Sequence, residues 1–372
     1  MFYFSDARCV FKAGKMQLQT EFPFYEPGNT INGKIFIEVP QPVQASHIEL
    51  EIKGKEEVKW IRHWMEQDGD RQVERHEKIH RDRKFLEYKQ RVFAVPGGFI
   101  NAGSSEVGFQ FVLPMGIPSS FYYKDKKCRE KAKAKVKYTI KATLCSTLTN
   151  DEMKYKQVLI VREPPVAFKA GEKQQEVSQI KTCCCLDKGT STMYSEFEKN
   201  VFLPNETVKG YVHVDNDHCQ IACTNVHFAA EQRLNLHVDH HNHHVNKDLV
   251  QQNVVGPAAG EGGWKREMSV DLSKIHYEVI TSVKSKKGGK KQLSPEDQFM
   301  MAAIQPACHG KWINNEYHLV VQCTYDGCTC CSNLPDSDSK ISIVPMVNPQ
   351  CFGFKPPGGW QPYNLGGFVV NL

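Results

Sequence analysis

The sequence repeats one pattern, first as Phe24-Tyr-Glu-Pro-Gly-Asn-Thr-Ile-Asn-Gly-Lys-Ile-Phe-Ile-Glu-Val39 and again as Val201-Phe-Leu-Pro-Asn-Glu-Thr-Val-Lys-Gly-Tyr-Val-His-Val-Asp-Asn216. The copies align in unbroken register at Pro27 and Pro204, Thr30 and Thr207, Gly33 and Gly210, and at three alternating apolar positions: Ile31, Ile35 and Ile37 against Val208, Val212 and Val214. A tight turn and a strand explain these residue types, with the glycine where another backbone approaches closely. The repeat therefore predicts the same turn-and-strand element in each of two similar domains.

Other short stretches share this alternation of apolar and polar residues. They include Ile48–Lys53, Val107–Leu113, Val158–Val161, Leu319–Gln322 and Ile341–Val344. Many short strands separated by turn residues are typical of sandwiches or barrels. The charged stretch Glu66–Tyr88 is expected to form a long exposed hairpin or loop. The fold class predicted is all-β, as two tandem β-sandwiches.

The length of 372 residues favours two domains. We expect an N-terminal sandwich over residues 1–163, a linker over 164–178, a C-terminal sandwich over 179–347 and a Gly/Pro-rich tail over 348–372. Pro164–Pro165 supports the linker because proline cannot occupy a central strand. The mild net charge of +5 fits partners that carry acidic groups and does not require nucleic acid.

The expected compartment is the cytoplasm. Met1–Phe11 lacks the features of a signal peptide, and no apolar run approaches the roughly 20 residues that span a bilayer. The 14 cysteines are then interpreted as thiols or metal ligands. A peripheral position at the endosome or plasma membrane is a further expectation.

A lysine ladder is the first candidate binding site. Lys131, Lys133, Lys135, Lys137 and Lys141 alternate with apolar residues, so a strand would place all five on one face. Such a ladder could hold a phosphorylated or acidic partner segment through charge-assisted contacts. The alternative is a solvated sheet edge that discourages aggregation.

A polybasic loop is the second candidate. Its lysines are Lys284, Lys286, Lys287, Lys290 and Lys291. Each lysine near an anionic membrane surface gains about 1 kcal/mol, so the loop could face a membrane. A solvated loop is the alternative.

Cysteine and histidine clusters suggest metal chemistry only weakly. The zinc candidates are Cys183, Cys185, Cys328 and Cys330, which lack a regular CxxC framework. Acylation of the Cys183–Cys185 triplet is a second possibility, and buried apolar thiols are the favoured one. The run His240–His244 does not have metal-site spacing, and an exposed polar loop is expected there.

The chain resembles the arrestin superfamily, particularly the α-arrestins. The segment Phe109-Gln-Phe-Val-Leu-Pro114 followed by Ile117-Pro-Ser-Ser-Phe121 is similar to the family's N-domain, and Lys181–Cys185 followed by Phe202-Leu-Pro-Asn-Glu206 is similar to the opening of its C-domain. The resemblance implies immunoglobulin-like sandwiches in both halves. The second turn departs from the family with Pro204–Asn205 in place of Pro-Gly, and the Pro-Pro-x-Tyr motifs that recruit ubiquitin ligases are absent.

The resemblance implies a non-catalytic adaptor without cofactors. Its partners would be cytoplasmic tails of membrane receptors or transporters, and its processes protein transport, endocytic sorting or signal transduction. The sequence contains no GxSxG, P-loop, GxGxxG or kinase motif. Two alternatives remain: a retromer-like sorting-coat subunit that meets cargo through partner subunits, and an enzyme with a zinc or thiol centre.

Overall fold

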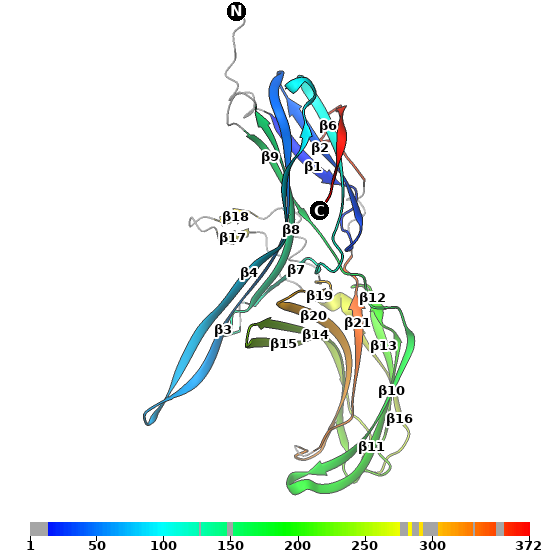
Figure 1. Cartoon of the computed structure of the whole chain (residues 1–372). Helices are drawn as coiled ribbons and strands as arrows, with labels where there is room; N and C mark the ends of the chain where they lie inside the picture. Colours follow the sequence, from blue (N-terminus) through cyan, green and yellow to red (C-terminus); the bar gives the residue numbers. More distant parts are fainter. Residues whose placement is uncertain are drawn as a thin grey trace, which may run out of the picture. The chain divides into compact units, whose positions relative to one another are not determined.

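The computed structural model describes residues 14–125, 128–146, 152–275, 282–284, 290–292, 304–329, 332–346 and 353–372 (Figure 1). The chain divides into two compact units. The first unit takes residues 1–163, 291–300 and 347–372, and the second takes 164–290 and 301–346. Within the described ranges the secondary structure is strands and three short 3₁₀ turns. The all-β prediction is therefore confirmed.

The first unit is built from two sheets in which most neighbouring strands are antiparallel. One sheet has the strand order β1-β2-β6-β22, and the other has β4-β3-β8-β7 with β5 and β9 attached. Their bounds are β1 Lys15–Thr20, β2 Thr30–Val39, β3 Val43–Asp68, β4 Arg71–Ala94, β5 Phe99–Ile100, β6 Gly103–Val112, β7 Phe121–Lys124, β8 Lys133–Ser146, β9 Glu152–Leu159 and β22 Tyr363–Val370. Fully buried aromatic side chains fill the core, among them Trp60, Tyr138, Phe36 and Phe111.

The second unit has the same plan. Its sheets have the orders β10-β11-β13-β16 and β12-β21-β20-β14-β15, with β19 paired to β20. Their bounds are β10 Ala170–Thr182, β11 Leu186–Lys199, β12 Val201–Phe202, β13 Thr207–Asp215, β14 Cys223–Val238, β15 His241–Val254, β16 Trp264–Asp271, β19 Cys308–His309, β20 Ile313–Tyr325 and β21 Asp336–Ile343. The inner faces of both sheets contribute to one apolar cluster, which includes Phe197, Phe228 and Leu319.

The sequence repeat corresponds to equivalent strands in the two units. β2 lies between β1 and β6, as β13 lies between β11 and β16. The next long strand in each unit, β3 or β14, forms a hairpin with its successor and pairs on its other side with β8 or β20. The repeat therefore marks the same element of the same sandwich, used twice.

The repeated glycine makes room for an aromatic ring. A Cβ built on Gly33 would lie 1.9 Å from Cζ of Phe109, which faces it from β6. At Gly210 the nearest atom is Cδ1 of Phe197, at 3.3 Å. The expectation that another backbone approaches this glycine is wrong: a phenylalanine ring from the neighbouring strand covers the pleat where the side chain is missing.

The charged stretch Glu66–Tyr88 and part of the expected Gly/Pro-rich tail both form strands. Glu66–Tyr88 lies in the β3–β4 hairpin, drawn as the long blue ribbon in Figure 1, so the hairpin prediction is confirmed. In the expected Gly/Pro-rich tail, β22 pairs in parallel with β6, and Phe368 stacks on Phe109 with ring centroids 6.1 Å apart. β10 begins at Ala170, inside the segment 164–178 that was expected to be a linker.

Among the described residues, no helix has the length and apolar character needed to cross a membrane.

Candidate functional site

The predicted lysine ladder lies on β8 with one exception. Lys133, Lys135, Lys137 and Lys141 are half-buried and alternate with buried residues, as a period of two requires. Lys131 precedes the strand in a turn with a positive φ of 47°, so it does not continue the ladder. β8 pairs with β3 on one side and with β7 and β9 on the other. The alternative of a solvated edge is therefore wrong, because β8 is an interior strand.

Carboxylates from β3 neutralise both ends of the ladder. The Nζ of Lys133 lies 2.9 Å from Glu57, and the Nζ of Lys141 lies 3.4 Å from Glu51. Burial raises the pKa of Glu57, but the hydrogen bond from Lys133 and the nearby cations outweigh it, and the net pKa is lowered. Lys135 places its ammonium 5.9 Å from the ring centre of Tyr122, within cation–π range.

Lysines from three neighbouring strands gather on this face. Lys137 on β8 lies directly opposite Lys55 on β3, and Lys141 lies opposite Lys156 on β9. The pKa of Lys156 is lowered, first by burial and then by the charge of Lys137. We call Lys55, Lys137 and Lys156 the central lysines. Two of them come from neighbouring strands and are not part of the ladder in the sequence.

Like charges crowded on one rigid sheet favour an anionic ligand. Lys55 also has an acidic neighbour, with its Nζ 2.7 Å from Asp82 of β4. A ligand with concentrated negative charge would have to exchange some of these carboxylate contacts for its own. The face formed by β3, β8 and β9, to which each strand contributes lysines, is termed the lysine face.

The cysteines do not form a metal site within the described residues. Cys183 and Cys185 are exposed around a 3₁₀ turn, Cys328 is exposed, and Cys330 lies outside the described residues. Cys219, Cys223, Cys308 and Cys323 are buried. The Sγ of Cys323 lies 3.6 Å from the Sδ of Met193. The interpretation of buried apolar thiols is therefore confirmed for these four cysteines and wrong for Cys183, Cys185 and Cys328.

The polybasic loop and the histidine run are the two remaining candidates from the sequence. The polybasic segment lies outside the described residues except for the backbone of β17 (Ser282–Lys284) and β18 (Lys290–Gln292), so Lys284, Lys286, Lys287, Lys290 and Lys291 stay a prediction. The histidine run forms the turn and start of the β14–β15 hairpin and not a loop. Nδ1 of His244 lies 2.6 Å from Oδ1 of Asn235, which supports a structural role for this histidine.

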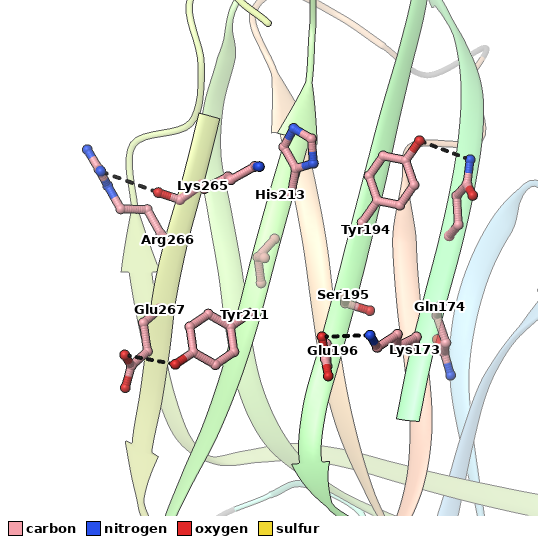
Figure 2. Close-up of a pocket in the computed structure, with 12 residues that line it drawn as sticks. Lys173, Gln174, Tyr194, Ser195, Glu196, Tyr211, His213, Lys265, Arg266 and Glu267 are labelled. Carbon is pink, nitrogen blue, oxygen red and sulfur yellow. Dashed lines mark hydrogen bonds and ion pairs between the residues drawn. The ribbon is translucent and has the colours of Figure 1, made fainter. Parts of the chain in front are cut away.

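A groove of about 740 Å³ lies on the exposed face of the sheet β10-β11-β13-β16 (Figure 2). Tyr194 and His213 stack in its floor with ring centroids 5.2 Å apart, and Nε2 of Gln175 donates to the Tyr194 hydroxyl at 3.2 Å. The Tyr211 hydroxyl donates to Glu267 at 3.4 Å. We call this the tyrosine groove. It was missed from the sequence, although exposed aromatic residues at outward strand positions were the available signal.

Burial lowers the pKa of His213, and the charge of Lys265 lowers it further. Nε2 of His213 is buried and has no hydrogen-bond partner among the residues that the structure describes. A neutral imidazole is therefore the favoured form in the folded protein.

Acidification is expected to destabilise the second unit through His213. In the unfolded chain this histidine takes up a proton near pH 6.5, whereas the folded form resists protonation until a lower pH. The free energy of unfolding should therefore fall as pH drops below about 6.5. Urea titrations of the wild type and His213→Gln at about pH 7.5 and 5.5 measure this. If the variant keeps the full pH dependence, the assignment to His213 is incorrect.

Comparison with known families agrees with this architecture. "Arrestin (or S-antigen), N-terminal domain" matches residues 14–165, and "Arrestin (or S-antigen), C-terminal domain" matches residues 187–348. The chain belongs to the arrestin superfamily. The lysine face lies within the matched N-terminal domain, and most of the tyrosine groove lies within the matched C-terminal domain. The groove strand β10 ends at Thr182, before that second match begins.

The similar curated proteins are arrestin domain-containing proteins, which supports the α-arrestin type. Arrestin domain-containing protein 5 of Bos taurus is 26% identical over 192 residues, covering 49% of this chain and 52% of its own length. Arrestin domain-containing protein 17 of Caenorhabditis elegans is 25% identical over 203 residues, covering 50% of this chain and 43% of its own length. The chain thus spans about half the length of these arrestin relatives. Membership supports a general adaptor role.

Proposed function

We propose that this arrestin-superfamily chain is an adaptor whose lysine face binds phosphorylated or acidic cytoplasmic segments of membrane receptors or transporters. The supporting observation is that the three central lysines, from three neighbouring strands, lie on one face of a rigid sheet. Trafficking, endocytic sorting or signalling would be the process served. The role requires binding alone, so no reaction or cofactor is assigned.

Charge density decides which partner fits. A phosphate group carries nearly two charges and three acceptor oxygens, so it can contact several lysines at once. A single carboxylate offers less charge and must compete with Glu51 and Glu57, which already accept from the ladder lysines. We therefore expect a segment with phosphate groups to bind more tightly than its unmodified form.

Charge reversal of the central lysines tests this function. Lys137→Glu combined with Lys156→Glu should weaken binding of a doubly phosphorylated peptide by at least tenfold, a loss of about 1.4 kcal/mol. The matched control is Lys247→Glu, an exposed lysine on β15 of the second unit. Fluorescence anisotropy with phosphorylated and unmodified peptides at two salt concentrations gives the measurement.

Neutralising the competing carboxylates should have the opposite effect. Glu51→Gln with Glu57→Gln releases Lys141 and Lys133, so affinity for the same phosphopeptide should rise several-fold. Equal binding by wild type, the lysine variant and the carboxylate variant would contradict the proposal. Cargo binding that ignores phosphate would favour a sorting-coat subunit instead.

A further inference from the structure

The tyrosine groove has rigid aromatic side chains exposed to solvent. Tyr211 is 60% exposed and Tyr194 is 39% exposed, although both are large aromatic residues. Tyr194 is held by the stack with His213 and by the hydrogen bond from Gln175. Such prearranged rings offer contact area with little further loss of side-chain entropy. The floor therefore has the properties of a binding platform.

The sheet itself excludes one class of ligand from this platform. β11 pairs with β10 and β13, and β13 pairs with β11 and β16, so the backbone of both floor strands is already hydrogen-bonded along the groove. An added β-strand needs unpaired backbone groups, which an interior strand does not offer. A ligand must bind through side chains, and the Tyr194 hydroxyl and the second N–H of the Gln175 amide remain as donors.

The charges divide the groove into two ends. Lys265 lies opposite His213 on β16, and neither Lys265 nor the neighbouring Arg266 has an ion pair among the described residues. At the other end Glu196 lies 3.4 Å from Lys173, and Glu267 accepts from Tyr211 (Figure 2). Glu267 also lies 3.9 Å from Nζ of Lys209. Two cations without an ion pair at one end suit a ligand with an acidic residue near Lys265.

We propose that the tyrosine groove binds a proline-containing peptide in the extended polyproline II conformation, with an acidic residue of the peptide directed at Lys265. Proline rings pack on exposed aromatic faces, and this conformation leaves the peptide carbonyls unpaired, so they can accept from hydroxyl and amide donors. The conformation is preformed, which limits the entropy lost on binding. This partner is separate from the one assigned to the lysine face, and the inference does not depend on that assignment.

A peptide display experiment on the full chain tests the proposal. The probe is a library of peptides of about ten residues with Pro-x-x-Pro spacing and one Asp or Glu, together with counterparts in which alanine replaces each proline. We expect the proline peptides to be enriched. Tyr194→Ala with Tyr211→Ala should weaken the enriched peptides at least tenfold, and Lys265→Glu should remove the preference for an acidic residue.

Controls separate loss of the groove from loss of the fold. Tyr363→Ala removes a partly exposed tyrosine from β22 of the first unit, and Lys247→Glu reverses a lysine on the other sheet of the second unit. Both should bind as the wild type does, and all variants should keep the wild-type circular dichroism spectrum. No enrichment of proline peptides over their alanine counterparts would overturn the proposal, as would equal binding by the double tyrosine variant.

Discussion

Replacing Gly33 with alanine is expected to destabilise the first unit by about 3 kcal/mol, near the upper end for overpacking a core. The added methyl group would meet three ring atoms of Phe109 at 1.9 to 2.5 Å. Phe109 is 4% exposed and lies among other aromatic rings, so it has little room to move. β2 and β6 would have to separate locally to accommodate the clash.

The internal repeat supplies a matched control for Gly33. Gly210→Ala makes the same chemical change at the equivalent position, but its methyl would lie 3.3 Å from Phe197, which a small adjustment relieves. The second substitution should cost less than about 1 kcal/mol. Urea unfolding followed by hydrogen exchange in each unit measures the two effects separately. Phe109→Leu should recover part of the loss in Gly33→Ala, and equal losses at both glycines would show that the ring contact is not the cause.

Replacing Arg83 with methionine is also expected to cost about 3 kcal/mol or more in the first unit. Glu56 lies on the apolar face of β3 and is 0% exposed. Nε of Arg83 donates to its Oε2 at 2.6 Å from the paired position on β4. Removing the guanidinium would leave a buried carboxylate without this charge partner, which is far worse than removing the whole pair.

Two variants distinguish a buried charge from a general hairpin defect. Lys55→Met breaks the neighbouring but exposed pair with Asp82, and exposed pairs contribute little, so stability should be nearly unchanged. Replacing Glu56 and Arg83 together with methionine should restore much of what Arg83→Met loses. Thermal and urea unfolding of the wild type, Arg83→Met, Glu56→Met and the double variant complete the double-mutant cycle. If the double variant is as unstable as the single one, the buried carboxylate does not explain the effect.

The fold was predictable because the repeat is local and periodic. Pro27, Thr30 and Gly33 mark a turn and a strand within a few residues, and the same spacing recurs at Pro204. The position of β22 was not predictable in this way. A short glycine-containing segment becomes a strand only because β6 offers an edge, and that information lies far away in the sequence.

The lysine face was predictable only along one strand. Alternation placed Lys133, Lys135, Lys137 and Lys141 together, because strand geometry depends on the local sequence. The contributions of Lys55 and Lys156, and the neutralising Glu57, depend on strand register, which no local pattern specifies. The tyrosine groove was missed for the same reason, since its lining residues come from four strands.

The pairing of β22 with β6 constrains the order in which the protein forms during synthesis. Gln361 donates to the hydroxyl of Ser104, a residue 257 positions earlier. The ribosome must therefore complete all of the second unit before the first can add the last strand to its sheet. Until then the β6 edge stays open to any extended chain nearby, so a stalled nascent polypeptide would be the form of this protein most prone to self-association.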